Sequence, residues 1–260
     1  MSLSTNDVSP KATVSASEWQ TRVDLAAFYR IVARNGWDDL LFAHISARLP
    51  DEAAYLVNPF GLLFEEITAS SLLKVDYEGN KLLPSEYDIS PEANVIHGTI
   101  LLGRSDVNCV AHVHTTAGTA VSSQQNGLLN ITQQTMIIGD RLGYHDYQGI
   151  VFDPAEGPSL QASLGDNLFL ILRNHGLLTV GSSVVQTYFG LYNLQRACET
   201  QVAAQSSDEI IPVPEAAIER SAPLLATINN TPPGVVPPIL ELLWKAELRS
   251  MRRNDPDFEI

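Results

Sequence analysis

Apolar and polar residues along the chain follow two different periods, one typical of helices and one typical of strands. Ser15 followed by Glu18 is a capping-box pattern, which begins many helices. Apolar residues then recur at helical spacing as far as Val32, and Gly36 follows them. A glycine just beyond such a stretch commonly ends a helix. The pattern therefore predicts a first helix between about residues 15 and 36.

Short apolar runs separated by turn residues predict the strands. In the run at 40–49, His44, Ser46 and Arg48 share one face because side chains alternate along a strand. Asn, Pro and Gly residues between the other runs are typical of turns. The remaining strand candidates lie at 53–68 around a turn at 58–61, at 72–84 around a turn at 78–80, at 107–114, at 131–139, at 143–152, and at 167–181 around a turn at 174–176.

Further helices are expected between these strands and at the end of the chain. Ser90 and Pro91 are a cap residue and a first-turn proline, which predict a helix that extends to about Arg104. Helices are also expected at 115–125, 183–205 and 239–251. Mixed strands and helices with frequent hairpins indicate an α/β fold. We expect a disordered tail at 1–13, one domain at 14–206, and a Pro-rich, helical extension at 207–260 that packs on this domain.

The composition excludes several classes of protein. The 260 residues carry a formal net charge of −14, and we find no basic stripe of the kind that nucleic acids require. The acidic balance also makes an anionic membrane an improbable partner, and no apolar stretch is long enough to span one. The polar first residues do not resemble a signal peptide, and two cysteines do not make a disulfide framework. We therefore expect a cytoplasmic protein.

Two histidines at the end of an apolar run are the strongest chemical signal in the chain. His112 and His114 are two residues apart, so they share one face of the predicted strand, whereas Cys109 has the opposite parity. Two imidazoles on one face can bind a divalent cation such as zinc, manganese, iron or cobalt. The alternative is a pair of hydrogen-bonded polar residues at the rim of a sheet.

A catalytic metal site needs a third protein ligand and one open position. His175 is the best candidate from the residues alone, because it ends an apolar strand and precedes Gly176. At such a turn, the side chain can be directed toward a neighbouring strand. No spacing rule connects His175 with the other two histidines, so at this point both readings of the pair stay open.

Four segments of the sequence resemble the class II aldolase/adducin family. They are HISARL, VNPFGLLFEEITASSLLKVDYEGN, RSDVNCVAHVHTTAGTAVS and LILRNHGLLTVG, in the order in which the family has them, between about Trp19 and Ala203. The resemblance implies a single three-layer α/β/α domain, with a central, mostly antiparallel sheet flanked by helices. It also implies a homotetramer with its active sites near the subunit interfaces.

The same resemblance implies a divalent metal, usually Zn²⁺, held by three histidines at the positions of His112, His114 and His175. Mn²⁺, Fe²⁺ or Co²⁺ are the alternatives. In the aldolases, the metal binds carbonyl and hydroxyl oxygens of the substrate and stabilises the enediolate that forms when a C–C bond breaks. The expected function is therefore that of a metal-dependent lyase acting on a small hydroxy-carbonyl or sugar-like substrate.

The chain departs from the sugar-phosphate aldolases at their acid/base. Their glutamate falls on Ala93 here, and Glu92 is one residue away. Adjacent helix residues point about 100° apart, so Glu92 does not inherit the role automatically. The preferred interpretation of Glu92 is an acidic residue in the first turn that the helix dipole favours. We retain Glu92 as a candidate acid/base. Tyr144 is a second candidate for moving a proton, with a core aromatic as its alternative.

The expected substrate contacts also differ from those of the sugar-phosphate aldolases. His44 replaces an asparagine of the family's phosphate-binding segment. Ser90 at a helix N-terminus, and Asn58 and Gly61 in a loop that resembles the family's phosphate loop, are further candidates for substrate binding. The alternative for Ser90 is a plain helix cap, so a phosphorylated sugar stays open as a substrate but is not indicated by these residues.

Two other functions compete with the lyase. The same metal site could serve decarboxylation, dehydration, epimerisation or oxygenation, which relatives of the family perform. A binding role without catalysis is the third reading, because adducin head domains have the same fold and similar NPFG and HISAR segments. The retained histidines favour a metalloenzyme over a scaffold.

Overall fold

The computed structural model describes residues 10–260 except for 151–153, 207–208, 230 and 233–234. A seven-stranded sheet in the order β3-β2-β1-β4-β7-β6-β5 forms its centre. All neighbouring strands are antiparallel except β5 and β6, which are parallel. The strands are β1 (His44–Arg48), β2 (Tyr55–Val57), β3 (Leu73–Val75), β4 (Cys109–Val113), β5 (Leu142–His145), β6 (Phe169–Leu172) and β7 (Gly176–Gly181).

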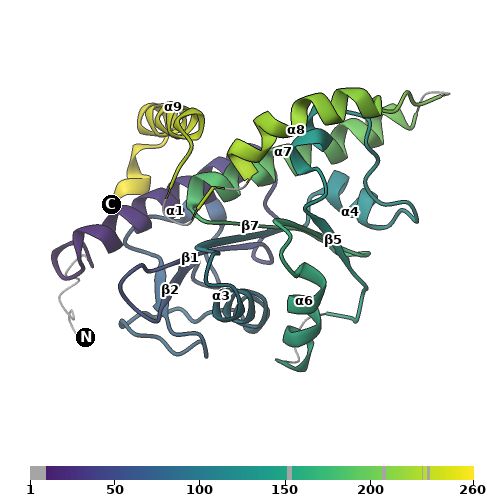
Figure 1. Ribbon diagram of the computed structural model, residues 1–260. Helices are drawn as coiled ribbons and strands as arrows, with labels where there is room; N and C mark the ends of the chain where they lie inside the picture. Colours follow the sequence, from purple (N-terminus) through teal and green to yellow (C-terminus); the bar gives the residue numbers. More distant parts are fainter. Residues whose placement is uncertain (1–9, 151–153, 207–208, 230, 233–234) are drawn as a thin grey trace.

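Helices cover both faces of this sheet, as Figure 1 shows. Helices α1 (Ala16–Arg34), α4 (Thr116–Ser122) and α7 (Val184–Ala204) lie on one face, and α3 (Thr99–Gly103) and α6 (Gly157–Leu164) lie on the other. The expected three-layer α/β/α fold with a mostly antiparallel sheet is therefore confirmed. The described residues also include α2 (Pro91–Ala93), α5 (Gln133–Ile138), α8 (Glu215–Asn229), α9 (Pro238–Asn254), a π-helical turn at Asn94–Gly98, and 3₁₀ turns at Pro10–Ala12, Phe64–Glu66, Pro154–Glu156 and Pro256–Glu259.

Helix α1 begins and ends where the sequence predicts. The Ser15 hydroxyl accepts a hydrogen bond from the Glu18 amide at 3.1 Å, which caps the helix. Gly36 follows the helix with a φ of +65°, a conformation that glycine adopts at little cost. The Glu18 carboxylate does not complete a capping box; it binds Arg22 and Lys74 instead.

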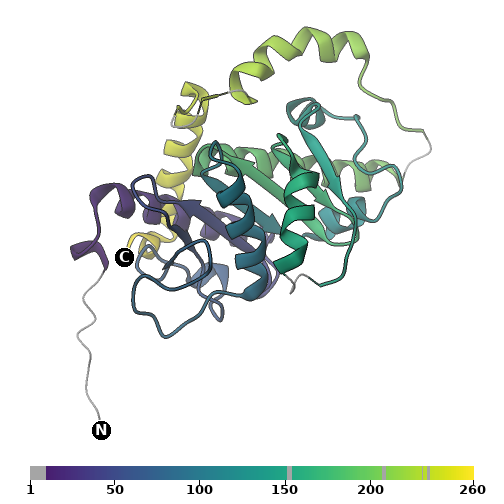
Figure 2. The same cartoon turned by 60° about the horizontal axis from the view of Figure 1, so that its bottom comes forward.

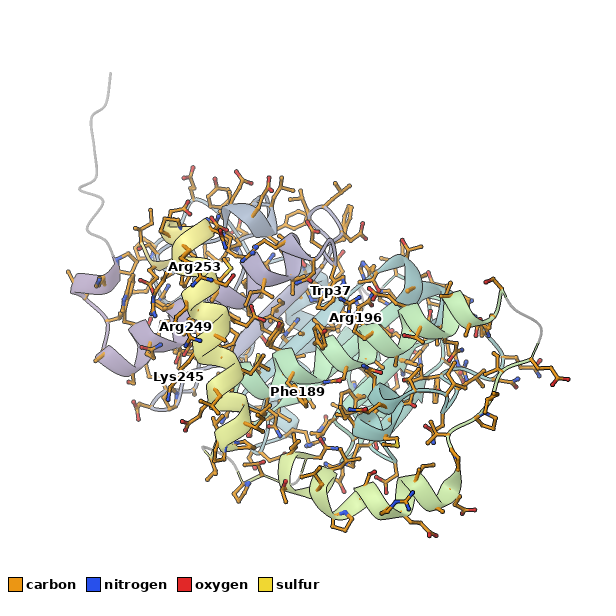
Figure 3. All side chains as sticks on the ribbon, turned by 90° about the horizontal axis from the view of Figure 1, so that it is seen from above. Trp37, Phe189, Arg196, Lys245, Arg249 and Arg253 are labelled. Carbon is orange, nitrogen blue, oxygen red and sulfur yellow. The ribbon has the colours of Figure 1, made fainter. Side chains whose placement is uncertain are left out.

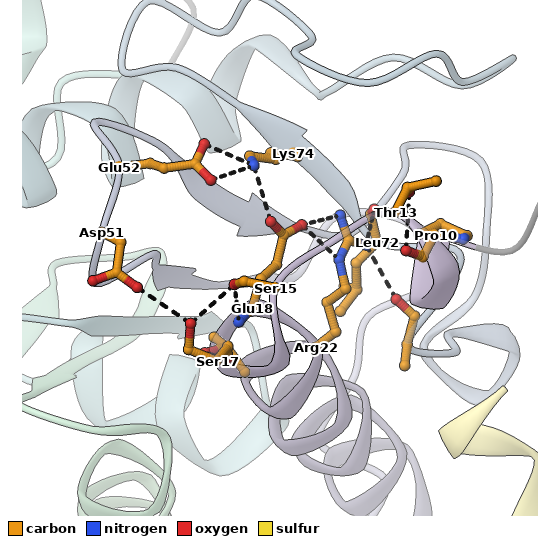
Figure 4. Close-up of polar contacts among 12 residues, drawn as sticks. Pro10, Thr13, Ser15, Ser17, Glu18, Arg22, Asp51, Glu52, Leu72 and Lys74 are labelled. Carbon is orange, nitrogen blue, oxygen red and sulfur yellow. Dashed lines mark hydrogen bonds and ion pairs between the residues drawn. The ribbon is translucent and has the colours of Figure 1, made fainter.

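A buried ion-pair network joins α1 to the edge of the sheet, as Figure 4 shows. Glu18 accepts hydrogen bonds from Arg22 Nε and Lys74 Nζ, both at 2.9 Å. Lys74 also pairs with Glu52, and Arg22 donates to the Leu72 carbonyl at 2.8 Å. Removing one partner from such a network would leave a buried charge unpaired, which is costly. The network therefore fixes α1 against β3, far along the sheet from the histidines.

Four expectations about secondary structure were wrong. After the turn at 78–80, the expected return strand is reduced to an isolated bridge between Lys81 and Val75. Residues 131–139 form the short helix α5 instead of a strand, because Thr132 caps it by accepting a hydrogen bond from the Thr135 amide at 3.2 Å. The segment Phe64–Glu66 is a 3₁₀ turn instead of a strand. Helix α8 was not expected. Of the candidate at 143–152, Leu142–His145 forms β5, and residues 151–152 lie outside the described residues.

The C-terminal segment contacts the domain through α9 and the last residues. Trp244 Nε1 donates to Asp24 of α1 at 2.7 Å, and Phe258 is fully buried. Arg30 of α1 pairs with Asp255 at 2.8 Å. Helix α8 lies at the periphery and has no buried residue (Figure 2). Residues 1–9 of the predicted tail lie outside the described residues, and Pro10–Ala12 form a 3₁₀ turn.

Helix α9 carries basic residues along its outer side, as Figure 3 shows for Lys245, Arg249 and Arg253. Lys245 pairs with Glu241 one turn earlier, at 3.4 Å. Arg252 and Arg253 lie in the last turn, where positive charge complements the helix dipole. Among the described residues, no helix combines the length and the apolar character that a membrane crossing would require.

Candidate metal centre

Strand β4 carries the two closely spaced histidines at the centre of the sheet. It pairs with β1 on one side and β7 on the other, with His112 opposite His44 and Leu178. The strand ends at Val113, so His114 follows its last residue. The rings of His112 and His114 lie with their centroids 4.6 Å apart. The expectation that the two side chains share a face agrees with this contact.

Cys109 of the same strand takes no part in the site. Its backbone carbonyl accepts a hydrogen bond from Thr187 of α7, and its side chain is buried. Burial raises the pKa of the Cys109 thiol to about 12, so the thiolate form that binds metals is not available near neutral pH.

The third histidine lies on the turn between β6 and β7. Asn174 adopts a φ of +56°, a left-handed conformation that asparagine tolerates better than most residues. At Gly176, a Cβ atom would lie 2.5 Å from the Val113 carbonyl oxygen and 3.0 Å from the His114 ring. Only glycine allows this close approach of the turn to the end of β4. The Asn-His-Gly sequence therefore brings His175 to His114.

The three imidazoles converge at their Nε2 atoms. His112 and His114 Nε2 are 2.8 Å apart, His114 and His175 Nε2 are 2.9 Å apart, and His112 and His175 Nε2 are 3.2 Å apart. Three nitrogens bound to one tetrahedral zinc ion would be roughly 3.3 Å apart, given a Zn–N bond of about 2.0 Å. Among the described residues, these three histidines form a cluster that could hold a metal ion, because their ligand atoms all lie within 4.8 Å of one another.

The opposite nitrogens of two of the rings are held by hydrogen bonds. His112 Nδ1 lies 2.9 Å from the Leu177 carbonyl oxygen, and His114 Nδ1 lies 3.0 Å from Asp39 Oδ2. Because both partners are acceptors, each Nδ1 is the donor and each Nε2 presents a lone pair. Lone pairs that face one another this closely repel unless a cation lies between them. The geometry and the donor set therefore fit a divalent metal.

Burial keeps the imidazoles of His112 and His175 neutral, which is the form that binds metals. Desolvation by burial, together with the neighbouring histidines, holds the pKa of His112 well below its ordinary value. The same causes lower the pKa of His175 to about 4. Protons therefore compete weakly with a metal for these nitrogens near neutral pH.

A cavity of about 360 Å³ opens beside the cluster. Three of the expected substrate or acid/base residues line it: His44, Ser90 and Glu92. Glu92 is half-buried, and the Ser90 hydroxyl caps α2 by accepting a hydrogen bond from the Ala93 amide at 3.0 Å. The other lining residues are Asp39, Leu41, Phe42, Phe60, Ile96, Tyr147, Gly149, Ile150 and Asn174 besides the three histidines.

His44 connects this cavity to a second buried histidine. Its Nδ1 lies 2.7 Å from His97 Nε2, and the other ring nitrogen of His97 contacts the Ser46 hydroxyl. His97 belongs to the π-helical turn Asn94–Gly98, which interrupts the helix that begins at Pro91. Burial lowers the pKa of His97 to about 3. The chain His44–His97–Ser46 is therefore a neutral, internally hydrogen-bonded unit beside the candidate metal centre.

Three other candidates lie elsewhere. The Asn58 side chain is buried, and its oxygen accepts a hydrogen bond from the Tyr29 hydroxyl at 2.9 Å. Gly61 has a φ of +119° and approaches Tyr87. The Tyr144 hydroxyl accepts a hydrogen bond from the Leu128 amide at 3.0 Å. None of these residues is among the described residues that line the cavity.

Asp39 is the site residue that sequence reasoning missed. It lies in the segment between α1 and β1, and its contact with His114 joins positions 75 residues apart. The only signal in the sequence is an acidic pair, Asp38 and Asp39, before a predicted strand. Adjacent acidic residues more commonly lie in a solvated loop, so nothing in the sequence distinguished Asp39 as a site residue.

Comparisons with known proteins agree on one family. Residues 23–202 match the family model described as Class II Aldolase and Adducin N-terminal domain. A Pseudomonas aeruginosa protein named "Putative aldolase class 2 protein" is 48% identical over 249 residues, which cover 95% of each chain. Mouse alpha-adducin is 41% identical over 190 residues, which are 72% of this chain and 26% of the adducin.

Solved structures support the same assignment. An aldolase II superfamily protein from Pseudomonas syringae superposes with a TM-score of 0.88 at 39% identity, covering 97% of this chain and 100% of the other. An L-fuculose 1-phosphate aldolase from Glaciozyma antarctica shares the fold, with a TM-score of 0.78 at 23% identity and coverage of 97% and 96%. The chain belongs to the class II aldolase/adducin family.

Proposed function

We propose that the protein is a metal-dependent lyase of the class II aldolase type, which cleaves or forms a C–C bond in a small hydroxy-carbonyl compound. The observation that carries this proposal is the convergence of His112, His114 and His175 beside a cavity. Two of the three rings are oriented by acceptors at Nδ1, as metal-binding histidines commonly are. A scaffold protein would have no need of this arrangement.

The three Nε2 atoms would hold the metal, and we propose Zn²⁺ as its identity, with Mn²⁺, Fe²⁺ or Co²⁺ as alternatives. When bound, the metal would supply Lewis-acid polarisation of a substrate carbonyl. Leu177 and Asp39 would fix the ring orientations before the metal binds. The surrounding cavity would orient the substrate.

Glu92 is the residue that we propose as the acid/base. Glu92 is half-buried and lines the cavity. It comes from a different segment than the histidines, in the first turn of the helix that begins at Pro91. A carboxylate oxygen there can accept the proton that a hydroxyl group loses when the adjacent C–C bond breaks. We propose that His44 binds a substrate oxygen, because His97, which itself contacts Ser46, holds the His44 ring in one orientation.

The metal content and the reaction can be tested together. Elemental analysis of the purified protein should find one divalent metal per chain, and His114→Ala should lose it. The metal-loaded protein should then cleave at least one compound in a panel of hydroxy-aldehydes and hydroxy-keto acids. Glu92→Gln should lower kcat by about 100-fold or more, whereas Glu86→Gln, an exposed glutamate outside the cavity, should not.

Other outcomes would redirect the assignment. Bound iron together with oxygen consumption would indicate an oxygenase, and loss of CO₂ from the keto acids would indicate a decarboxylase. Sedimentation analysis tests the expected homotetramer, and fractionation of the source cells tests the expected cytoplasmic location. A metal-loaded protein that is inactive on the whole panel would refute the lyase.

A binding role is the second candidate, and one observation favours it. Identity to mouse alpha-adducin is 41%, which exceeds the 23% identity to the L-fuculose 1-phosphate aldolase structure. A non-catalytic protein should purify without stoichiometric metal, and its thermal stability should not change when the metal is added. Retention of metal by the wild type but not by His114→Ala would exclude this reading.

A further inference from the structure

We propose that this cavity selects an uncharged hydroxy-carbonyl compound that carries an apolar substituent, and that it rejects phosphorylated substrates. The inference rests on the proposed metal centre, because the metal would hold the polar end of the substrate. It adds the class of the substrate, which follows from the charges and the apolar side chains around the cavity.

The cavity offers no cation from the chain itself to bind a phosphate. Its described lining includes the carboxylates of Asp39 and Glu92 but neither lysine nor arginine. The residues that the structure does not describe contain neither of these types in the sequence. A metal ion and two carboxylates leave little net positive charge, and a formal net charge of −14 repels anions from the whole surface.

Arg173, next to the turn that carries His175, is engaged elsewhere. Its guanidinium lies over the Tyr144 ring at 4.3 Å and donates to the Gln124 carbonyl oxygen at 2.7 Å. Arg173 does not line the cavity itself, although it lines a smaller pocket that shares Tyr147 and His175 with it.

The helix N-terminus at the cavity is also occupied by the chain's own groups. The Ser90 hydroxyl accepts the hydrogen bond of the Ala93 amide, and Glu92 places its carboxylate in the same first turn. A helix N-terminus attracts anions through its free amides and its dipole. Here an incoming phosphate would have to approach a carboxylate, so this end of the helix does not form a phosphate site.

The opening of the cavity is apolar instead. Among the described lining residues, Phe42 is 58% exposed, Phe60 42%, Tyr147 52% and Ile150 70%. Aromatic and aliphatic side chains with a few polar groups at the base are typical of sites for small organic ligands. The Tyr147 ring lies 6.5 Å from the His175 ring, so the apolar opening begins beside the proposed metal centre.

Hydrogen bonds fix the backbone at two of these residues. The Phe42 amide donates to the Asp39 carbonyl at 2.8 Å, and the Phe60 amide donates to the Asp88 carbonyl at 2.9 Å. Phe42 precedes β1, Phe60 follows β2, and Tyr147 and Ile150 follow β5. Three segments of the chain therefore surround the opening with apolar groups, which suits a phenyl or branched alkyl substituent.

Hydroxamates that differ only in their substituent test the inference without requiring turnover, because a hydroxamate chelates a protein-bound divalent metal. Binding of acetohydroxamate, phenylacetohydroxamate and phosphoglycolohydroxamate to the zinc-loaded full chain would be measured by calorimetry. We expect the phenyl compound to bind at least tenfold more tightly than acetohydroxamate. We expect the phosphorylated compound to bind no more tightly than acetohydroxamate.

Matched variants assign the effect to the side chains. Phe42→Ala should weaken the phenyl compound about fivefold and leave acetohydroxamate unchanged, whereas Leu82→Ala, an exposed residue outside the cavity, should change neither. Glu92→Gln should strengthen the phosphorylated compound about threefold at low salt, whereas Glu86→Gln should not. All four positions are at least partly exposed, so the variants are expected to fold.

The outcomes separate this inference from the proposed function. Tightest binding of the phosphorylated compound would overturn the inference and leave the metal centre intact. Failure of the chain to load zinc would refute the proposed metal centre, and failure of every hydroxamate to bind the zinc-loaded protein would show that the metal has no open position toward the cavity, which overturns the inference. A Phe42→Ala variant that changes the sedimentation coefficient but not the preference for the phenyl compound would show that the apolar opening serves subunit contact, which also overturns the inference.

Discussion

The contact between Asp39 and His114 makes a specific prediction about metal affinity. Asp39 Oδ2 accepts the hydrogen bond of His114 Nδ1 at 3.0 Å, which directs the lone pair of Nε2 toward the other two rings. In Asp39→Ala, the His114 ring would lose this partner and would be free to rotate or to take the other tautomer. Part of the binding free energy of the metal would then be used to orient the His114 ring, so the metal affinity would fall.

The size of the effect follows from the exposure of the carboxylate. Loss of such a partner typically lowers metal affinity by about 10- to 100-fold, or about 1.4–2.7 kcal/mol. The Asp39 side chain is 42% exposed, so solvent screens its charge and water can replace part of the hydrogen bond. We therefore expect the lower end of the range, a loss of about tenfold. Asp39→Asn keeps an acceptor without the charge and should lose less than Asp39→Ala.

Competition with a chelator of known zinc affinity would measure the two variants against the wild type. Asp38→Ala is the matched control, because it removes the same charge from the neighbouring position. We expect its zinc affinity to stay within about twofold of the wild type. Equal losses in Asp38→Ala and Asp39→Ala would refute the reasoning, because the effect would then be one of net charge instead of ring orientation.

Three further predictions concern the ligands, the buried histidine and the C-terminal segment. Chelator competition should show that His175→Ala binds zinc at least 100-fold more weakly than the wild type. The circular dichroism of this variant should stay native. Burial lowers the folded pKa of His97 to about 3 from 6.5, so the unfolded chain binds the extra proton and stability falls as pH decreases below 6.5. In urea unfolding of the metal-free protein, His97 should lower the free energy of unfolding by about 1 kcal/mol between about pH 6 and pH 5. The His97→Gln variant should lack this contribution. Phe258→Ala empties a fully buried site and should lower the free energy of unfolding by about 3–5 kcal/mol in the same assay; a change below about 1 kcal/mol would show that the last turn is dispensable.

The convergence of the three histidines could be predicted in part because local rules determine their geometry. Alternation along a strand places His112 and His114 together whatever the rest of the fold does. The turn residues Asn174 and Gly176 indicate a tight corner at His175, and the structure shows what each contributes. What the residues alone could not predict is that β7 lies beside β4, since strand neighbours are set by the whole sheet. The family resemblance supplied that step.

The errors in secondary structure arise where local and tertiary effects compete. Residues 131–139 contain an apolar run that suits a strand or a short helix equally, and the Thr132 cap decides for the helix. Helix α8 has an interior proline, Pro223, in a Pro-rich part of the chain, and an interior proline normally argues against a helix. The long helices α1 and α7, whose buried faces repeat over many turns, were predicted to within a few residues.

The three histidines and the side chains at the opening of the cavity belong to different parts of the fold. His112 and His175 lie at or next to the ends of central strands, where the pairing of β4 with β7 leaves little freedom. Phe42, Phe60 and Tyr147 lie in segments between elements, which can change in sequence without disturbing the sheet. In the enzyme that we propose, the sheet would therefore fix the metal ligands, and the connecting segments would set the substrate. The preference for an apolar or a phosphorylated hydroxamate measures the second property separately from the first.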